Sequence, residues 1–287
     1  MRLRVFCCLA VLGLVLLGTA SFGQEKAKAP APPAPEAKAP ASQAQPAKAQ
    51  DIDPKQVVRE MCDYLKSLQE FSFQGEVTDD HTYSAGNKLQ FAFGLEGYVK
   101  RPDKIRLNAR GDLQNKEVYY DGQAFTIYDT VKKVYATASM PSTIDEALAK
   151  ANSDYGIRLI VAQLAKTNLF EEITEGMKDE VYVGEGTVFG VKCHHVAFDK
   201  GKAVVQLWVE ASDKPVLRKV VVTYKEVEFS PQWTLYLTEW NVSPQLADNL
   251  FAFSPPPGAE KIDFITVMKT KAPERGKGQP KKKGGRS

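Results

Sequence analysis

Histidine and cysteine are scarce in this chain, with 3 and 4 of them in 287 residues. The spacings Cys-x-x-Cys, His-Glu-x-x-His and Gly-x-Ser-x-Gly do not occur, so the usual zinc sites and the serine-hydrolase elbow have no signature here. Metal-ligand types gather at Cys193-His194-His195. Neighbouring residues of a strand point to opposite faces, however, and hydrogen bonding within a sheet is their commoner use. We therefore predict no metal site, no cofactor and no catalytic site; a hydrolase with an unrecognised site is the alternative.

A long apolar run is also missing. Residues 1–23 have a basic start, an apolar run from Val5 to Ala20 and small residues at Ser21 and Gly23, which is the pattern of a signal peptide. The run is shorter than the about 20 residues of a stable membrane span. We predict export, with cleavage before Gln24 or Ser21. An uncleaved segment that anchors the protein in the membrane is the alternative.

Both ends of the chain lack the apolar residues that a core needs. Residues 24–50 are almost entirely Ala, Pro, Lys and Gln, and residues 269–287 carry eight basic residues and one acidic residue. Such compositions are typical of disordered segments. We therefore predict a linker over 24–50, one folded domain over 51–268 and a basic tail over 269–287.

The predicted domain lacks an excess of positive charge. Of the 38 basic and 35 acidic residues in the chain, 14 and 3 lie outside residues 51–268, which leaves 24 and 32 and a net charge of −8. A basic surface is the footprint of nucleic-acid binding, so we predict no nucleic-acid partner. The basic tail is predicted either to touch an anionic envelope or membrane surface, or to act only as a solubilising segment.

Two cysteines remain in the predicted domain, Cys62 and Cys193. Export to an oxidising compartment permits a disulfide between them. They lie on different predicted elements, and their spacing does not show whether they meet. The sequence leaves this bridge open.

Alternation of apolar and polar residues is what the chain has in abundance. Residues 88–100 place Leu89, Phe91, Phe93, Leu95 and Val99 on one face. Short alternating runs between Pro and Asp-Gly turns predict an antiparallel meander. The strands predicted in this half cover 71–79, 88–100, 104–110, 118–120, 124–128 and 133–138.

Helical periodicity occurs on both sides of these strands. Asp53 and Pro54 begin an amphipathic helix that ends by Glu70. Ser142 is predicted to cap a helix over 144–151, a second helix continues over 155–166, and 169–177 is ambiguous. Five further strands are predicted over 180–185, 188–198, 203–210, 216–226 and 232–241.

This order of elements predicts a mainly β fold with α elements (α+β). About eleven strands in sequence form one antiparallel sheet, which is too long to stay flat and should curve strongly. Three helices must then cover its concave side. Such an arrangement encloses an apolar cavity between the sheet and the helices.

Three stretches carry a family resemblance. GYVKRPDKIRLNARGDLQNKEVYYDGQAFTIYD and LADNLFAFSPPPGAEKID resemble the lipoprotein carrier LolA, with its V-K-R-P corner and its F-x-F-x-P-P ending. GVKCHHVAFDKGKAVVQLWVEASDKPVLRKVVVTY resembles an uncharacterised family of predicted bacterial periplasmic proteins with H-x-A-F, Q-x-W-[IV] and P-x-x-R-K motifs. That family groups with the LolA, LolB and LppX folds. The resemblance implies a periplasmic protein and an unclosed β-barrel with a helical lid.

We predict a non-catalytic binding or carrier protein for a lipid or another hydrophobic small molecule. Apolar cavities leave no catalytic signature and bind by non-directional burial. By the resemblance, Arg101 helps to hold the lid and to release the ligand; pairing with Asp103 is its alternative role. Phe71, Trp233 and Trp240 are possible further contributors, and a plain core is the alternative for the aromatic row. The cavity or gate candidates are Phe73, Phe91, Phe93, Leu95, Tyr98, Arg101, Ile105, Leu107 and Trp208. The alternative function is an envelope interaction or structural protein with no ligand cavity in use.

Overall fold

The structure is a computed structural model that describes residues 52–83 and 86–266. The predicted signal peptide, linker and basic tail lie outside the described residues. None of the helices in this part is both long and apolar enough to span a membrane.

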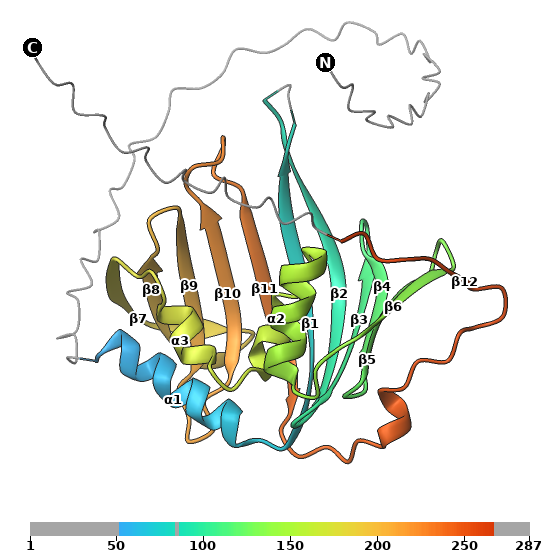
Figure 1. The fold of residues 1–287 in the computed structure, drawn as a ribbon. Helices are drawn as coiled ribbons and strands as arrows, with labels where there is room; N and C mark the ends of the chain where they lie inside the picture. The colour runs from blue at the N-terminus through green and yellow to red at the C-terminus, as the bar shows by residue number, and fades with distance from the viewer. Residues whose placement is uncertain (1–51, 84–85, 267–287) are drawn as a thin grey trace, which may run out of the picture. The chain divides into compact units, whose positions relative to one another are not determined.

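Two antiparallel meanders make up one sheet (Figure 1). The first contains β1 (Glu70–Thr82), β2 (Lys88–Lys100), β3 (Lys104–Gly111), β4 (Asn115–Tyr120), β5 (Ala124–Asp129) and β6 (Val134–Ser139). The second contains β7 (Asp179–Val188), β8 (Val191–Asp199), β9 (Ala203–Glu210), β10 (Leu217–Tyr224) and β11 (Gln232–Asn241). The two meet where β1 pairs with β11 in antiparallel register, with Val77 opposite Leu235.

The sheet is curved and unclosed, as predicted. Its order is β12-β6-β5-β4-β3-β2-β1-β11-β10-β9-β8-β7, so β12 and β7 form the edges. The twelfth strand, β12 (Glu260–Lys261), is only two residues long and pairs with β6 in parallel. It arrives from the far end of the chain and covers an edge that would otherwise be open to pairing.

Helices cover the concave face, which we call the inner face (Figure 1). They are α1 (Pro54–Ser67), α2 (Ile144–Tyr155) and α3 (Leu169–Thr174), with a 3-10 turn η1 (Val161–Ala165) between the last two. In α1 the side chain of Asp53 accepts a hydrogen bond from the Lys55 amide and so caps the helix. Its predicted apolar stripe is buried at Val57, Val58, Met61, Cys62 and Leu65.

Two helix predictions were wrong. The cap of α2 is Thr143, whose hydroxyl accepts a hydrogen bond from the Glu146 amide, and not Ser142. The predicted helix over 155–166 does not form. Gly156 adopts a left-handed conformation with φ of 67° and ends α2, which glycine does without steric cost. Residues 157–160 then run as an irregular segment into η1.

The core lies between the inner face and the helices. Phe71, Val77, Val99 and Leu237 are almost completely buried there. Phe73 faces Gly97 across the β1–β2 pair, and its ring fills the space that a side chain at Gly97 would need. The glycine inside a strand is thus explained by the packing of an aromatic ring across it.

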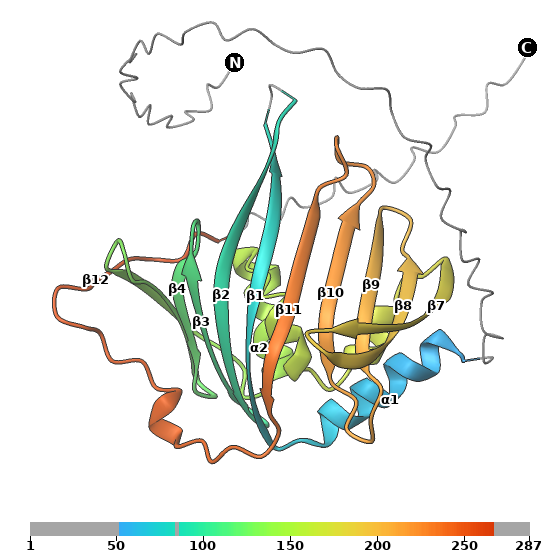
Figure 2. The same cartoon turned by 180° about the vertical axis from the view of Figure 1, so that it is seen from behind.

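The chain after β11 runs past the end of the sheet and around to β12 at the edge (Figure 2). On the way it packs against the opposite face of the sheet, which we call the outer face. The segment contains the short turn η2 (Asp248–Leu250). Phe251 is buried, and the Phe253 ring packs against Tyr119, Tyr128 and Tyr135 at centroid distances of 5.0 to 5.8 Å. This segment covers an outer face that would otherwise expose three tyrosines.

Candidate functional site

An apolar cavity of about 230 Å³ lies between the inner face and residues 158–161. The sheet contributes apolar side chains from β2, β3, β4, β5 and β11, and the irregular segment contributes Leu159, Ile160 and Val161. Polar groups are few: Asp79, Gln114, Lys116 and Arg158. The apolar sheet residues are Phe93, Leu95, Leu107, Ala109, Val118, Ile127 and Trp233.

Three predicted site residues line this cavity: Phe93, Leu95 and Leu107. The inner-face alternation of β2 and β3 carries them there, since Leu95 pairs with Ala109 and Gly97 with Leu107. Phe91 lies farther along β2, where its ring packs edge-on against the His81 ring with the two centroids 5.1 Å apart. Phe73 and Ile105 share the inner face but belong to the closed core, with 3% and 2% of their surfaces exposed.

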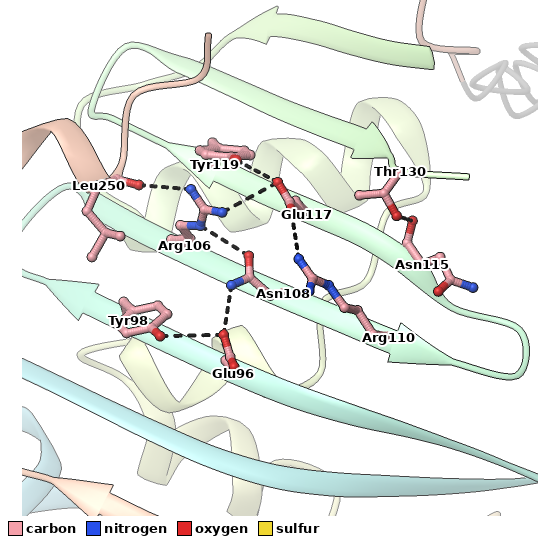
Figure 3. Close-up of polar contacts among 10 residues, drawn as sticks. All are labelled: Glu96, Tyr98, Arg106, Asn108, Arg110, Asn115, Glu117, Tyr119, Thr130 and Leu250. Atoms are coloured by element: carbon pink, nitrogen blue, oxygen red, sulfur yellow. Dashed lines mark hydrogen bonds and ion pairs between the residues drawn. The ribbon is translucent and has the colours of Figure 1, made fainter. Parts of the chain in front are cut away.

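Two predicted site residues belong to the outer face, so their assignment to the cavity is corrected. Tyr98 alternates with the buried Val99, and its hydroxyl lies 3.5 Å from Glu96 (Figure 3). Trp208 sits between the buried Leu207 and Val209 and therefore points the other way. The alternation itself contained this signal for both residues.

The outer-face network around Tyr98 is polar, and its side chains hydrogen-bond one another (Figure 3). Glu117 accepts hydrogen bonds from Arg106, Arg110 and the Tyr119 hydroxyl. Burial and the bond to Glu117 raise the pKa of Tyr119 to about 12. Arg106 also donates to the Leu250 carbonyl at 3.4 Å and so ties the C-terminal segment to the sheet. We interpret this network as structural.

Trp208 belongs to a second outer-face cluster. His195 stacks on Trp208 with centroids 3.9 Å apart and hydrogen-bonds Gln206, while Lys219 lies over both Trp208 and Tyr236. Apart from Tyr236, these residues come from the H-x-A-F, Q-x-W-[IV] and P-x-x-R-K motifs, which the register brings side by side. His195 and Lys219 both contact the Trp208 ring, one from each neighbouring strand, so the motifs serve cross-strand packing.

Arg101 connects α1 and η1 to the sheet. It follows β2, and its guanidinium donates to the carbonyls of Leu68 at 3.0 Å, Leu65 at 3.3 Å and Ala165. The first two carbonyls end α1 and the third ends η1. Arg101 does not pair with Asp103, which instead contacts Lys104. Burial lowers the pKa of Arg101, and Asp145 partly offsets this.

A larger hollow, of about 560 Å³, lies beside Arg101. Most of the residues that line it carry polar groups, among them Gln69, Thr143, Asp145 and Thr167. Asp145 accepts a hydrogen bond from the Thr167 amide at 3.0 Å. This hollow adjoins the Arg101 contacts, whereas the smaller cavity is lined by more apolar side chains.

The remaining reactive side chains have structural partners. His194 lies 3.0 Å from the Tyr182 hydroxyl. Cys62 and Cys193 are buried free thiols, so no disulfide joins them. Burial raises the pKa of Cys62 to about 12, which keeps it in the unreactive thiol form. No cluster of potential metal ligands occurs among residues 52–83 and 86–266.

Sequence reasoning missed part of the site. Leu159, Ile160 and Val161 were assigned to a helix, and only Gly156 signalled that the helix ends before them. Trp233 lines the cavity, as its inclusion among the possible contributors anticipated. Trp240 does not: its ring packs on Phe71 and Phe73, and its Nε1 donates to the Leu217 carbonyl at 2.9 Å.

Several solved structures resemble this fold at low identity. An uncharacterized conserved protein from Thermus thermophilus is 9% identical, with 73% of this chain and 98% of that chain covered and a TM-score of 0.42. Lipoprotein LppX from Mycobacterium tuberculosis is 10% identical, with coverages of 69% and 100% and a TM-score of 0.40. A chain of the MucA/MucB complex of Pseudomonas aeruginosa is 16% identical, with 71% of this chain and 62% of that chain covered and a TM-score of 0.41. At these scores the likenesses carry no inference about a ligand.

No curated protein matches the chain. One family model does, over residues 54–265, and its description reads predicted periplasmic protein (DUF2092). The match begins at α1 and ends just beyond β12, so it spans nearly all of the described residues.

Proposed function

The chain belongs to the DUF2092 family of predicted periplasmic proteins, and we propose that it binds and carries a lipid or another hydrophobic molecule without altering it. The predicted family and the predicted periplasmic location are both confirmed by that membership. The proposed binding site is the cavity between the inner face and residues 158–161.

The observation that supports this proposal is the composition of the cavity wall. Phe93, Leu95, Leu107 and Trp233 face Leu159 and Ile160 across it, and polar groups are confined to four of its residues. Each methylene group buried against such a wall contributes about 0.8 kcal/mol. Affinity of this kind depends on buried area and needs no catalytic or metal chemistry.

The size of the cavity sets a condition on binding. Its volume of about 230 Å³ is below the about 300–1,000 Å³ of typical ligand pockets. A long acyl chain therefore requires the irregular segment to move outward. Residues 157–160 are suited to this, because they lie outside regular secondary structure and Ile160 is already 45% exposed.

A charge placed in the cavity tests the proposal. Phe93→Asp should leave the protein folded, because Phe93 is only partly buried and water can follow the carboxylate into the cavity. Binding of a fluorescent fatty-acid probe should fall by about tenfold or more, as expected for losing one large apolar contact. Circular dichroism checks the fold, and a fluorescence titration measures the binding.

Val131→Asp is the matched control, since Val131 is 70% exposed in the β5–β6 turn and lies outside the cavity. It should bind the probe like the wild type. Equal binding by wild type and Phe93→Asp would contradict the proposal. Unfolding of Phe93→Asp, with no probe binding by the wild type, would favour the envelope interaction or structural protein. Contact of the basic segment 269–287 with an anionic envelope surface stays a prediction.

A further inference from the structure

Exposed apolar side chains gather at one end of the sheet, on two neighbouring hairpins. They are Tyr83 and Leu89 from the β1–β2 hairpin and Val227 and Phe229 from the β10–β11 turn, each between 44% and 50% exposed. We call these four residues the tip patch. Because β1 pairs with β11, the two hairpins are adjacent, and they extend past the neighbouring strands (Figures 1 and 2). Exposed apolar clusters of this kind mark interaction surfaces.

The turn that carries Phe229 has an unusual backbone conformation. Phe229 and Ser230 have φ values of 65° and 42°, in the left-handed region that bulky residues avoid. The Phe229 ring lies over the other hairpin, where a side chain added at Gly86 would come within 3.7 Å of it. Strained residues of this sort persist where surrounding structure and function retain them. The strained backbone and the exposed aromatic ring lie in the same turn.

An apolar row connects the tip patch with the proposed binding cavity. Leu89, Phe91 and Phe93 are alternate residues of β2 and share its inner face. Leu89 belongs to the patch and Phe93 lines the cavity. Four residues of strand separate them by roughly 13 Å. A hydrophobic molecule that enters at the patch would meet apolar surface all along this path.

Three lysines near the patch pair with carboxylates, and the exposed Glu228, between Val227 and Phe229, adds a negative charge. Lys88 contacts Asp80 at 2.8 Å, Lys225 contacts Asp199 at 2.7 Å and Lys202 contacts Glu226 at 3.2 Å. The described part of this end therefore presents no cationic surface for phosphate groups. A surface that combines Tyr and Phe with aliphatic side chains and, in its described part, presents no cationic surface fits the interfacial layer of a bilayer with zwitterionic headgroups better than that of an anionic one.

We propose that the tip patch docks the protein on the surface of a phospholipid bilayer, and that the row Leu89-Phe91-Phe93 leads the ligand into the cavity. The second half of this proposal rests on the proposed function, whereas docking stands independently of it. The turns at the opposite end of the sheet include the polar pairs Asp121-Gly122 and Ser212-Asp213.

Sedimentation with phosphatidylcholine vesicles tests the docking. The full mature chain should bind these vesicles, and Phe229→Ser should bind about tenfold more weakly, because one phenyl ring no longer enters the interface. Phe189→Ser is the matched control. Phe189 is also exposed, at 69%, and also has a positive φ, of 48°, but it is not part of the tip patch: its ring packs against Tyr236 of β11 at a centroid distance of 5.4 Å. It should bind like the wild type.

The lipid composition separates docking from attraction by the basic tail. Neutral vesicles minimise the tail's contribution, and binding to them should change little with salt, since salt screens only the charged term. Absence of binding to neutral vesicles, or equal loss in Phe229→Ser and Phe189→Ser, would overturn the docking proposal. Probe binding in solution without vesicles should be unchanged in Phe229→Ser. Failure of that titration in the wild type would instead overturn the proposed function.

Discussion

Arg101 shows how one side chain can join two elements to the sheet. Its guanidinium reaches carbonyls at the ends of both α1 and η1, a geometry that suits the planar fork of arginine. Arg101→Leu should lower the free energy of unfolding by about 1–3 kcal/mol, because partly buried carbonyls lose their donor, and it should speed probe release. Thermal melting and stopped-flow dissociation measure the two effects. Arg101→Lys keeps the charge but lacks the planar guanidinium, so its stability and its rate of probe release should lie between those of the wild type and Arg101→Leu. An unchanged rate of release in both variants would show that Arg101 does not control release of the ligand.

Protonation of His195 makes the free energy of unfolding depend on pH. Burial lowers the pKa of His195, Lys219 lowers it further, and only the bond to Gln206 opposes this. Between the folded pKa and the unfolded value of about 6.5, the unfolded chain binds more protons, so stability rises with pH. The contribution is complete above about pH 6.5 and is lost as the pH falls through the folded pKa.

His195→Phe should reduce that loss, because phenylalanine can still stack on Trp208 but cannot take up a proton. Denaturant unfolding of both proteins from neutral to mildly acidic pH measures the difference. Parallel pH profiles for wild type and variant would show that His195 does not contribute to the acid sensitivity.

At the scale of elements, most strands were predictable because their alternation is local. Residues 88–100 and 203–210 match β2 and β9 residue for residue. The segment after α2 was not predictable, because Ile157, Leu159, Ile160, Val161 and Leu164 repeat with helical spacing although they serve two surfaces. Leu159, Ile160 and Val161 line the cavity, and Leu164 is buried in η1. Periodicity cannot distinguish one apolar stripe from two short ones.

Gly156 decides between these two interpretations. In a continuous helix, Gly156→Ala would stabilise the protein by about 0.5–1 kcal/mol. In the structure Gly156 has a φ of 67°, so alanine should destabilise it by about 1 kcal/mol. Chemical denaturation gives the sign directly. A stabilised variant would contradict the irregular lid segment and the cavity beneath it.

At the scale of the whole molecule, the curved sheet with a helical cover could be predicted from the number and order of elements. The pairing of β1 with β11 could not, because it joins residues such as Val77 and Leu235 that are distant in sequence. The parallel pairing of β12 with β6 was equally invisible, since two residues carry no periodic signal. Long-range order depends on packing between elements, which local patterns do not encode.

The candidate site was predictable to the same degree. Phe93, Leu95 and Leu107 were found because strand alternation places them on the dry face. Which part of that face stays open depends on where the helices stop. Phe73 and Ile105 lie under the cover as core, while Phe93 lies at its margin beside the irregular segment. The boundary between core and cavity is a property of the whole arrangement.

The most direct test of the central claim is to identify what the protein carries. Wild-type protein is purified from the periplasm without detergent, extracted with organic solvent and analysed by mass spectrometry, with Phe93→Asp treated in parallel. The account predicts a hydrophobic molecule in stoichiometric amount with the wild type and its depletion from the variant. An extract with no such molecule, or the same amount from both proteins, would contradict the claim that this cavity is a lipid-binding site.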